Sequence, residues 1–171
     1  MNPSYFRIQV SKDEALRRFT SWSNSADIVP LVQVNISDSV KLACDKHGRW
    51  RGNAVFVSEL RGWTLFQDLS GSLSGLHHDS WLKLAGTDHL VFAGYNDAIP
   101  DGELIVINEG SVKRVFYEQP DSPELNINIG SLSTDLEPQP FLSWVDIASF
   151  VDADELAFSD TGWLWVFRPN T

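Results

Sequence analysis

The chain has 171 residues, of which 43% are hydrophobic and 12% aromatic, with one cysteine and a formal net charge of −10 at pH 7. This composition excludes a disordered chain, an internal disulfide and a cysteine-based zinc cluster, and the length predicts a single globular domain over residues 1–171, because domains usually hold roughly 100–200 residues. The negative charge disfavours binding to nucleic acid or to an anionic membrane.

The first predicted element is a helix over residues 12–23. Ser11 and Glu14 have the spacing of a capping box, in which Ser11 is the N-cap. Apolar residues that include Phe19 and Trp22 then recur at helical spacing. We therefore expect an amphipathic helix that buries one aromatic face.

Strand-like runs follow this helix. Residues 28–36 are apolar and β-branched, and Pro30 places that strand at a sheet edge or at its own start. Residues 39–44 alternate between polar and apolar and are predicted as a strand. Residues 54–67 are predicted as a hairpin that turns at Arg61-Gly62.

The middle of the chain contains one more predicted helix and three more strands. Residues 78–85 have helical spacing, and residues 89–95 return to a strand pattern. Two further strands, 102–107 and 112–118, flank a turn that contains Gly110 and form a predicted hairpin.

Residues 119–140 are rich in proline and polar residues and are predicted to be a long loop. A helix over 141–151 and two short strands, 156–159 and 163–167, complete the chain. The order of these elements predicts an α+β fold, with a mainly antiparallel sheet and about three short helices.

Known catalytic and cofactor motifs do not occur: there is no G-x-x-x-x-G-K-[ST], no G-x-G-x-x-G and no G-x-S-x-G. His77, His78 and Asp79 are consecutive, and neighbouring side chains of a regular element point apart, so we expect no metal site there. Glu103 and Asp97 flank a turn and are interpreted as solvated. We therefore expect no cofactor and no catalytic residue.

The N-terminal residues contain no apolar signal-peptide core. No stretch approaches the roughly 20 apolar residues of a membrane span, and the longest apolar stretches, such as 163–167, have the length of a strand. We therefore expect a cytoplasmic protein.

The charge is unevenly distributed along the chain. Residues 1–96 contain 10 Lys/Arg and 9 Asp/Glu, whereas residues 97–171 contain 3 Lys/Arg and 14 Asp/Glu. A compact protein with one strongly negative part attracts basic surfaces. The one basic-aromatic cluster, around Trp50, is too small for a nucleic-acid site. The expected partner is therefore a basic protein, although acidity that only maintains solubility is an alternative.

Three segments of the chain have a distinctive sequence: GWTLFQDLSG at 62–71, LVFAGYNDAIP at 90–100 and SWVDIASFVD at 143–152. Together they resemble bacterial immunity proteins that neutralise polymorphic toxins, such as those of contact-dependent growth inhibition systems. The resemblance implies a protein that is not an enzyme and that binds a cognate toxin domain. Many such toxins are basic nucleases.

An acidic surface would accelerate binding to a basic toxin by electrostatic steering, whereas tight binding also requires apolar anchors. Such a surface either covers the basic active site of the toxin or binds an exosite, and the sequence allows both. The carboxylates that we expect at this surface come from the acidic half of the chain: Asp121, Glu124, Asp135, Glu137, Asp152, Asp154 and Glu155.

Two alternative functions remain open. An acidic secretion chaperone or adaptor would more often be a dimer with an exposed apolar groove. A small enzyme with an unrecognised site would need a concave pocket that holds an acid or histidine with a strongly perturbed pKa.

Overall fold

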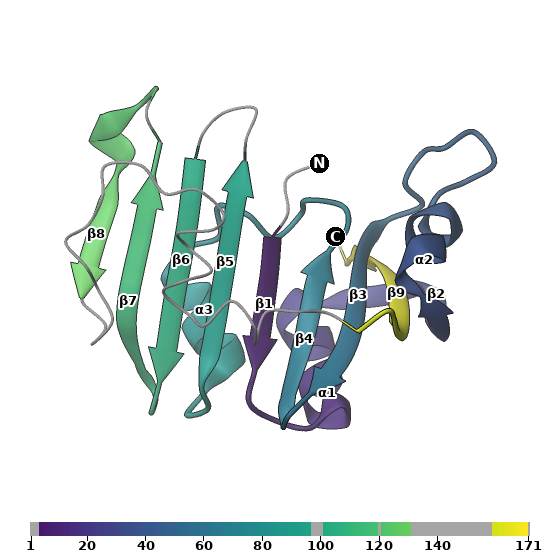
Figure 1. Cartoon of the computed structure of the whole chain (residues 1–171), viewed down its shortest axis with the longest axis horizontal. Helices are drawn as coiled ribbons and strands as arrows, with labels where there is room; N and C mark the ends of the chain where they lie inside the picture. The colour runs from purple at the N-terminus through teal and green to yellow at the C-terminus, as the bar shows by residue number, and fades with distance from the viewer. Residues whose placement is uncertain (1–3, 97–100, 120, 131–158, 171) are drawn as a thin grey trace.

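The computed structural model describes residues 4–96, 101–119, 121–130 and 159–170. Within these ranges the chain forms one nine-stranded sheet and three α-helices (Figure 1). The strand order is β2-β9-β3-β4-β1-β5-β6-β7-β8, and each neighbouring pair is antiparallel. This arrangement confirms the predicted α+β fold with a mainly antiparallel sheet.

The strands are β1 (Ser4–Ile8), β2 (Ser25–Asn35), β3 (Asn53–Leu60), β4 (Trp63–Asp68), β5 (Leu90–Asn96), β6 (Asp101–Asn108), β7 (Ser111–Glu118), β8 (Ile127–Gly130) and β9 (Thr161–Pro169). The helices are α1 (Lys12–Ser23), α2 (Ile36–Ala43), α3 (His78–Ala85) and a single 3-10 turn, η1 (Pro123–Leu125).

Strand β1 lies at the centre of the sheet and joins its two parts. It pairs with β4 on one side and with β5 on the other. Strands β5 to β8 follow one another in sequence toward one edge, whereas β9 inserts between β2 and β3 near the other edge. Residues 101–130 and residues 25–63 therefore lie at opposite ends of the sheet (Figure 1).

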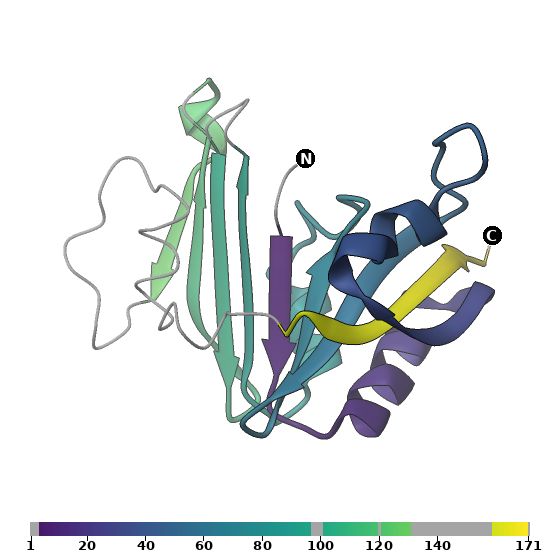
Figure 2. The same cartoon turned by 45° about the vertical axis from the view of Figure 1, so that its right-hand side comes forward.

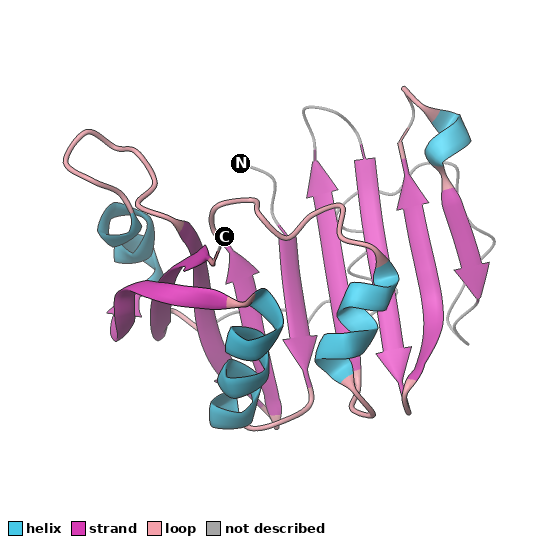
Figure 3. Ribbon diagram, turned by 180° about the vertical axis from the view of Figure 1, so that it is seen from behind, coloured by secondary structure: helices cyan, strands magenta, loops and turns pink. Residues whose placement is uncertain are grey.

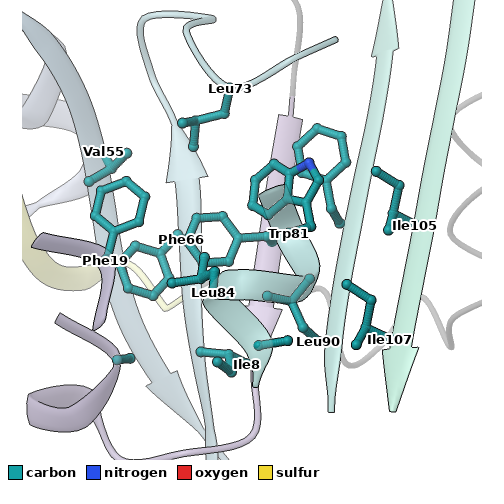
Figure 4. Packing of buried hydrophobic residues seen from close by; sticks show 14 of the residues in the cluster. Ile8, Phe19, Val55, Phe66, Leu73, Trp81, Leu84, Leu90, Ile105 and Ile107 are labelled. Atoms are coloured by element: carbon teal, nitrogen blue, oxygen red, sulfur yellow. The ribbon is translucent and has the colours of Figure 1, made fainter. Parts of the chain in front are cut away.

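Helices α1 and α3 cover the same face of the sheet (Figure 3), and the main hydrophobic core lies beneath them. Phe19 of α1 and Trp81 of α3 are fully buried there. Phe6 of β1 stacks on Phe66 of β4, with ring centroids 4.2 Å apart. Figure 4 shows how side chains from both helices and the strands meet in this core.

Helix α2 packs on the opposite face, over β3 and β9. Ala43 of the helix contacts a second apolar cluster that includes Phe56 and Leu164, and Figure 2 shows α2 and α1 on different sides of the sheet. The prediction of a strand over 39–44 is therefore wrong. Ile36, Val40 and Ala43 are spaced i, i+4 and i+7, which places them on one helical face, and the apparent alternation was incidental.

Helix α1 has the predicted bounds, but its predicted capping box is wrong. The Ser11 side chain makes no capping hydrogen bond. Glu14 instead accepts hydrogen bonds from the guanidinium groups of Arg17 and Arg18, at 2.7 and 2.6 Å. Charge-assisted bonds to arginine are stronger than a bond to a backbone N–H, so they hold the carboxylate away from the helix start.

The two predicted hairpins are confirmed, as β3–β4 and β6–β7. Their turns, Arg61-Gly62 and Glu109-Gly110, have positive φ at both positions, which matches the right-handed twist of the strands. Strand β2 is an edge strand, as Pro30 predicts, and its register with β9 shifts on both sides of Val29. The helix over 78–85 is confirmed as α3.

The C-terminal part differs from the prediction. Residues 127–130 form strand β8 inside the segment predicted to be a loop, and they pair with β7. Strand β9 begins before and ends after the predicted 163–167. The predicted helix over 141–151 lies outside the described residues. Among the described helices, none is both long and apolar enough to cross a membrane.

Candidate functional site

A cavity of about 300 Å³ lies on the face of the sheet that carries α3, between the N-terminus of that helix and strands β6, β7 and β8. This volume is at the lower end of the roughly 300–1,000 Å³ of small-molecule sites. The apolar part of its wall consists of Leu76, Ile105, Val115, Leu125 and Ile127, and the polar part of His77, His78, Glu103 and Tyr117. We call it the Glu103 cavity.

The strand register brings the polar groups of the Glu103 cavity together. Glu103 of β6 lies opposite Tyr117 of β7, and Tyr117 lies opposite Ile127 of β8. Residues directly opposite in neighbouring strands point to the same face of a sheet, so these three side chains share the face that carries α3. Ile105 and Val115 form the next pair along the same face.

Glu103 is the innermost polar group, with only 8% of its surface exposed. Its Oε2 accepts a hydrogen bond from the backbone N–H of Gly75, at 3.1 Å. The pKa of Glu103 is raised to about 7, mainly by burial; the hydrogen bond from Gly75 opposes this rise, and the negative charge of Asp101 adds to it. Glu103 therefore changes its protonation near neutral pH, as groups used in binding or catalysis often do.

Negative charge also affects the neighbours of Glu103. Burial raises the pKa of Tyr117, and the charges of Asp101 and Glu103 add to this increase. Burial also raises the pKa of Asp101. The strand ends around the Glu103 cavity therefore form a negative region that favours a positively charged ligand.

Asp68, at the end of β4, holds the loop that carries Gly75. This carboxylate is 2% exposed and accepts hydrogen bonds from the backbone N–H groups of Ser70, Gly71 and Leu73, at 3.0, 2.9 and 2.8 Å. Hydrogen bonds to a charged group are stronger than neutral ones. Asp68 therefore determines where the loop meets the edge of the Glu103 cavity.

His77 and His78 lie at the start of α3, with ring centroids 4.0 Å apart. The expectation that their side chains point apart is wrong, because His77 is the N-cap, with extended backbone angles, and not part of the regular helix. Its Nδ1 accepts a hydrogen bond from the backbone N–H of Asp79. Ligand atoms of the three residues lie within 4.8 Å of one another, but two of them are exposed, and this spacing alone does not make a metal site.

Two of the predicted acidic residues, Asp121 and Glu124, are exposed on the segment that enters and forms η1. Leu125, which directly follows Glu124, is part of the cavity wall, so Glu124 lies next to the Glu103 cavity. The other five lie outside the described residues: Asp135, Glu137, Asp152, Asp154 and Glu155.

The strand order separates charge along the sheet. Residues 101–130, which form β6, β7, η1 and β8, contain six Asp/Glu and two Lys/Arg. Residues 25–63, which form β2, α2 and β3, contain four Asp/Glu and five Lys/Arg. We call the first segment the acidic end and the second the basic end.

The sequence interpretation missed the burial of Glu103. Its place at a strand end suggested a solvated turn, whereas the structure buries it. The available signal was its alternation with Ile105 and Ile107, which places an acid on an apolar strand face. The covering of that face by α3 and by the loop at Gly75 is a tertiary feature.

Comparison of the chain with protein-family models, with curated proteins and with solved structures gave no match.

Proposed function

We propose that this chain is a cytoplasmic immunity protein, not an enzyme, that binds and neutralises a cognate, basic, nuclease-like bacterial toxin domain through its acidic end. The observation that supports this proposal best is the separation of charge along the sheet. A charge asymmetry of this kind orients an approaching basic protein toward one end of the molecule and away from the other.

The acidic end also offers apolar side chains for a tight contact. Leu125 and Ile129 are 54% and 52% exposed, the largest exposures among the bulky apolar residues of the described ranges. Leu125 directly follows the exposed Glu124, and Ile129 lies on β8, the strand that follows η1. Protein interfaces typically combine a few apolar anchors with a polar rim, and this arrangement has both parts.

The proposal predicts binding of the protein that the neighbouring gene encodes, because immunity and toxin genes are expressed together. Expression of that protein alone should arrest bacterial growth, and co-expression of this chain should restore it. Covering the active site and binding an exosite both satisfy this test. Growth arrest that persists although the two proteins are co-expressed and soluble would contradict the proposal.

Charge reversal tests whether the acidic end makes the contact. The double variant Asp121→Lys/Glu124→Lys should associate about tenfold more slowly at low salt and depend less on salt than the unmodified chain. The matched control is Asp13→Lys/Asp38→Lys, which makes the same change in net charge at exposed positions of α1 and α2. Equal association rates for the two variants in stopped-flow measurements would show that the acidic end is not the contact.

A further inference from the structure

We propose that the Glu103 cavity receives a lysine or arginine side chain of the partner protein, with the aliphatic stem against the apolar wall and the cationic head at the Glu103 carboxylate. The identity of the partner rests on the proposed function, whereas the chemistry of the cavity does not. This site would supply the central anchor that the exposed acids of the acidic end lack.

The volume and lining of the Glu103 cavity suit a long amphipathic side chain. Leu76, Val115 and Ile127 provide apolar contacts along the wall, and Glu103 is the most buried of its polar side chains. Lysine and arginine side chains can bury their apolar stem and carry a charged group at its end. A purely apolar side chain would leave the buried carboxylate without a cation.

Glu103 has the capacity for such a partner. Its Oε2 accepts the bond from Gly75, and among the described residues no hydrogen bond reaches Oε1. A buried carboxylate that lacks a cation is costly, and a charge-assisted hydrogen bond offsets that cost. Among the described residues, the cavity wall contains no lysine or arginine, and Lys113 of β7 is paired with Glu109.

The other titratable groups near Glu103 have defined effects. The negative charge of Asp101 on β6 favours a cation, whereas Tyr117 on β7, whose pKa is raised above its usual value of 10, is neutral at the pH of the test. His77 and His78 on the wall add positive charge when protonated and oppose one. The ionisation of Glu103 itself makes binding of a cation stronger as the pH rises.

The first test uses residue-sized probes and the whole chain. Nα-acetyl-lysine methylamide and Nα-acetyl-arginine methylamide are titrated into the ¹⁵N-labelled protein, and the amide resonance of Gly75 reports on the Glu103 carboxylate. The matched control probe is Nα-acetyl-norleucine methylamide, which has the stem of lysine without the ammonium group. We expect saturable shifts with the two cationic probes and at least tenfold weaker binding of the norleucine probe.

Two further results are expected from the same titration. Binding of the lysine probe should be about tenfold weaker at pH 6 than at pH 8, because the ionised fraction of Glu103 changes by that factor around a pKa near 7. Glu103→Gln should weaken it at least tenfold, whereas Glu109→Gln, at an exposed turn, should not change it. Equal binding of the lysine and norleucine probes, or unchanged binding to Glu103→Gln, would overturn the proposal.

Binding kinetics with the partner protein distinguish this inference from the proposed function. Glu103→Gln should increase the dissociation rate of the complex with little effect on association, because a buried anchor acts after the encounter. Slower association of Asp121→Lys/Glu124→Lys, together with an unchanged dissociation rate of Glu103→Gln, would overturn the cavity proposal and leave the proposed function intact. Failure of the unmodified chain to bind or neutralise the neighbouring protein would instead remove the proposed function.

Discussion

Trp22 of α1 donates its indole N–H to the backbone carbonyl of Ser80 in α3, at 2.8 Å, and so links the two helices that cover one face of the sheet. The rings of Trp22 and Trp81 lie 5.3 Å apart at this junction. Trp81 also stacks on Phe92 of β5, with centroids 4.4 Å apart. These contacts make Trp81 the aromatic centre between the two helices and the strands beneath them.

Trp81→Ala should lower the free energy of unfolding by about 3–5 kcal/mol, because it removes a fully buried ring and leaves a cavity in the main core. Trp50, which is 38% exposed, is the matched control, and Trp50→Ala should change stability by less than about 0.5 kcal/mol. Urea unfolding of both variants measures the difference. Similar losses for the two would mean that Trp81 does not carry the packing described here.

The burial of Glu103 predicts a pH dependence of stability. The pKa of this carboxyl is about 7 in the folded protein and near 4.5 when unfolded. The unfolded state therefore loses its proton first, and the contribution of Glu103 to stability falls as the pH rises between these values and is constant above pH 7. Other carboxylates behave differently; the pKa of Glu14, for example, is lowered to about 2 by its arginine partners.

Glu103→Gln isolates this effect, because it keeps the acceptor for Gly75 and removes the ionisation. Relative to the unmodified chain, the variant should gain about 2–3 kcal/mol of stability between pH 5 and pH 8. Urea unfolding of both proteins at each pH measures the gain, and contributions from other groups cancel in the comparison. A constant difference between the proteins from pH 5 to pH 8 would contradict the raised pKa.

Two strand glycines have different surroundings. A Cβ on Gly162 of β9 would lie 2.3 Å from the backbone oxygen of Val57 on β3, whereas a Cβ on Gly94 of β5 would lie 3.4 Å from the nearest atom, in Ser4. Gly162→Ala should therefore destabilise the protein by about 1–3 kcal/mol or more, since the backbones of two strands must separate. Gly94→Ala is the control and should be close to neutral in thermal unfolding. A neutral result for Gly162→Ala would argue against the pairing of β9 with β3.

Asp68→Ala should destabilise the protein by about 3 kcal/mol or more, because it leaves the N–H groups of Ser70, Gly71 and Leu73 without their acceptor. The matched control is Asp88→Ala, which removes a partly exposed ion pair with Arg18 and should cost less than about 1 kcal/mol. Hydrogen exchange should show faster exchange at the three amides in Asp68→Ala alone. Unchanged exchange at these positions would show that other contacts hold the loop.

Most of the local structure could be predicted from the amino-acid sequence alone. The spacing of Phe19 and Trp22 was enough to predict α1. The turn residues Arg61-Gly62 and Glu109-Gly110 were enough to predict two hairpins, because positive φ at a two-residue turn is a local requirement. The uneven charge of the two halves of the chain also follows directly from the sequence. Residues 36–43 show where local pattern is ambiguous, since a short apolar run fits a strand or a helix until a partner surface is known.

The position of the candidate site depends on long-range packing. The insertion of β9 between β2 and β3 and the central place of β1 arise from long-range strand pairing, which no local pattern specifies. That order separates the acidic end from the basic end. Glu103 is buried because α3 and the loop anchored by Asp68 cover its face of the strand. Burial, and with it the raised pKa, depends on which distant segments pack on a residue rather than on its neighbours in sequence.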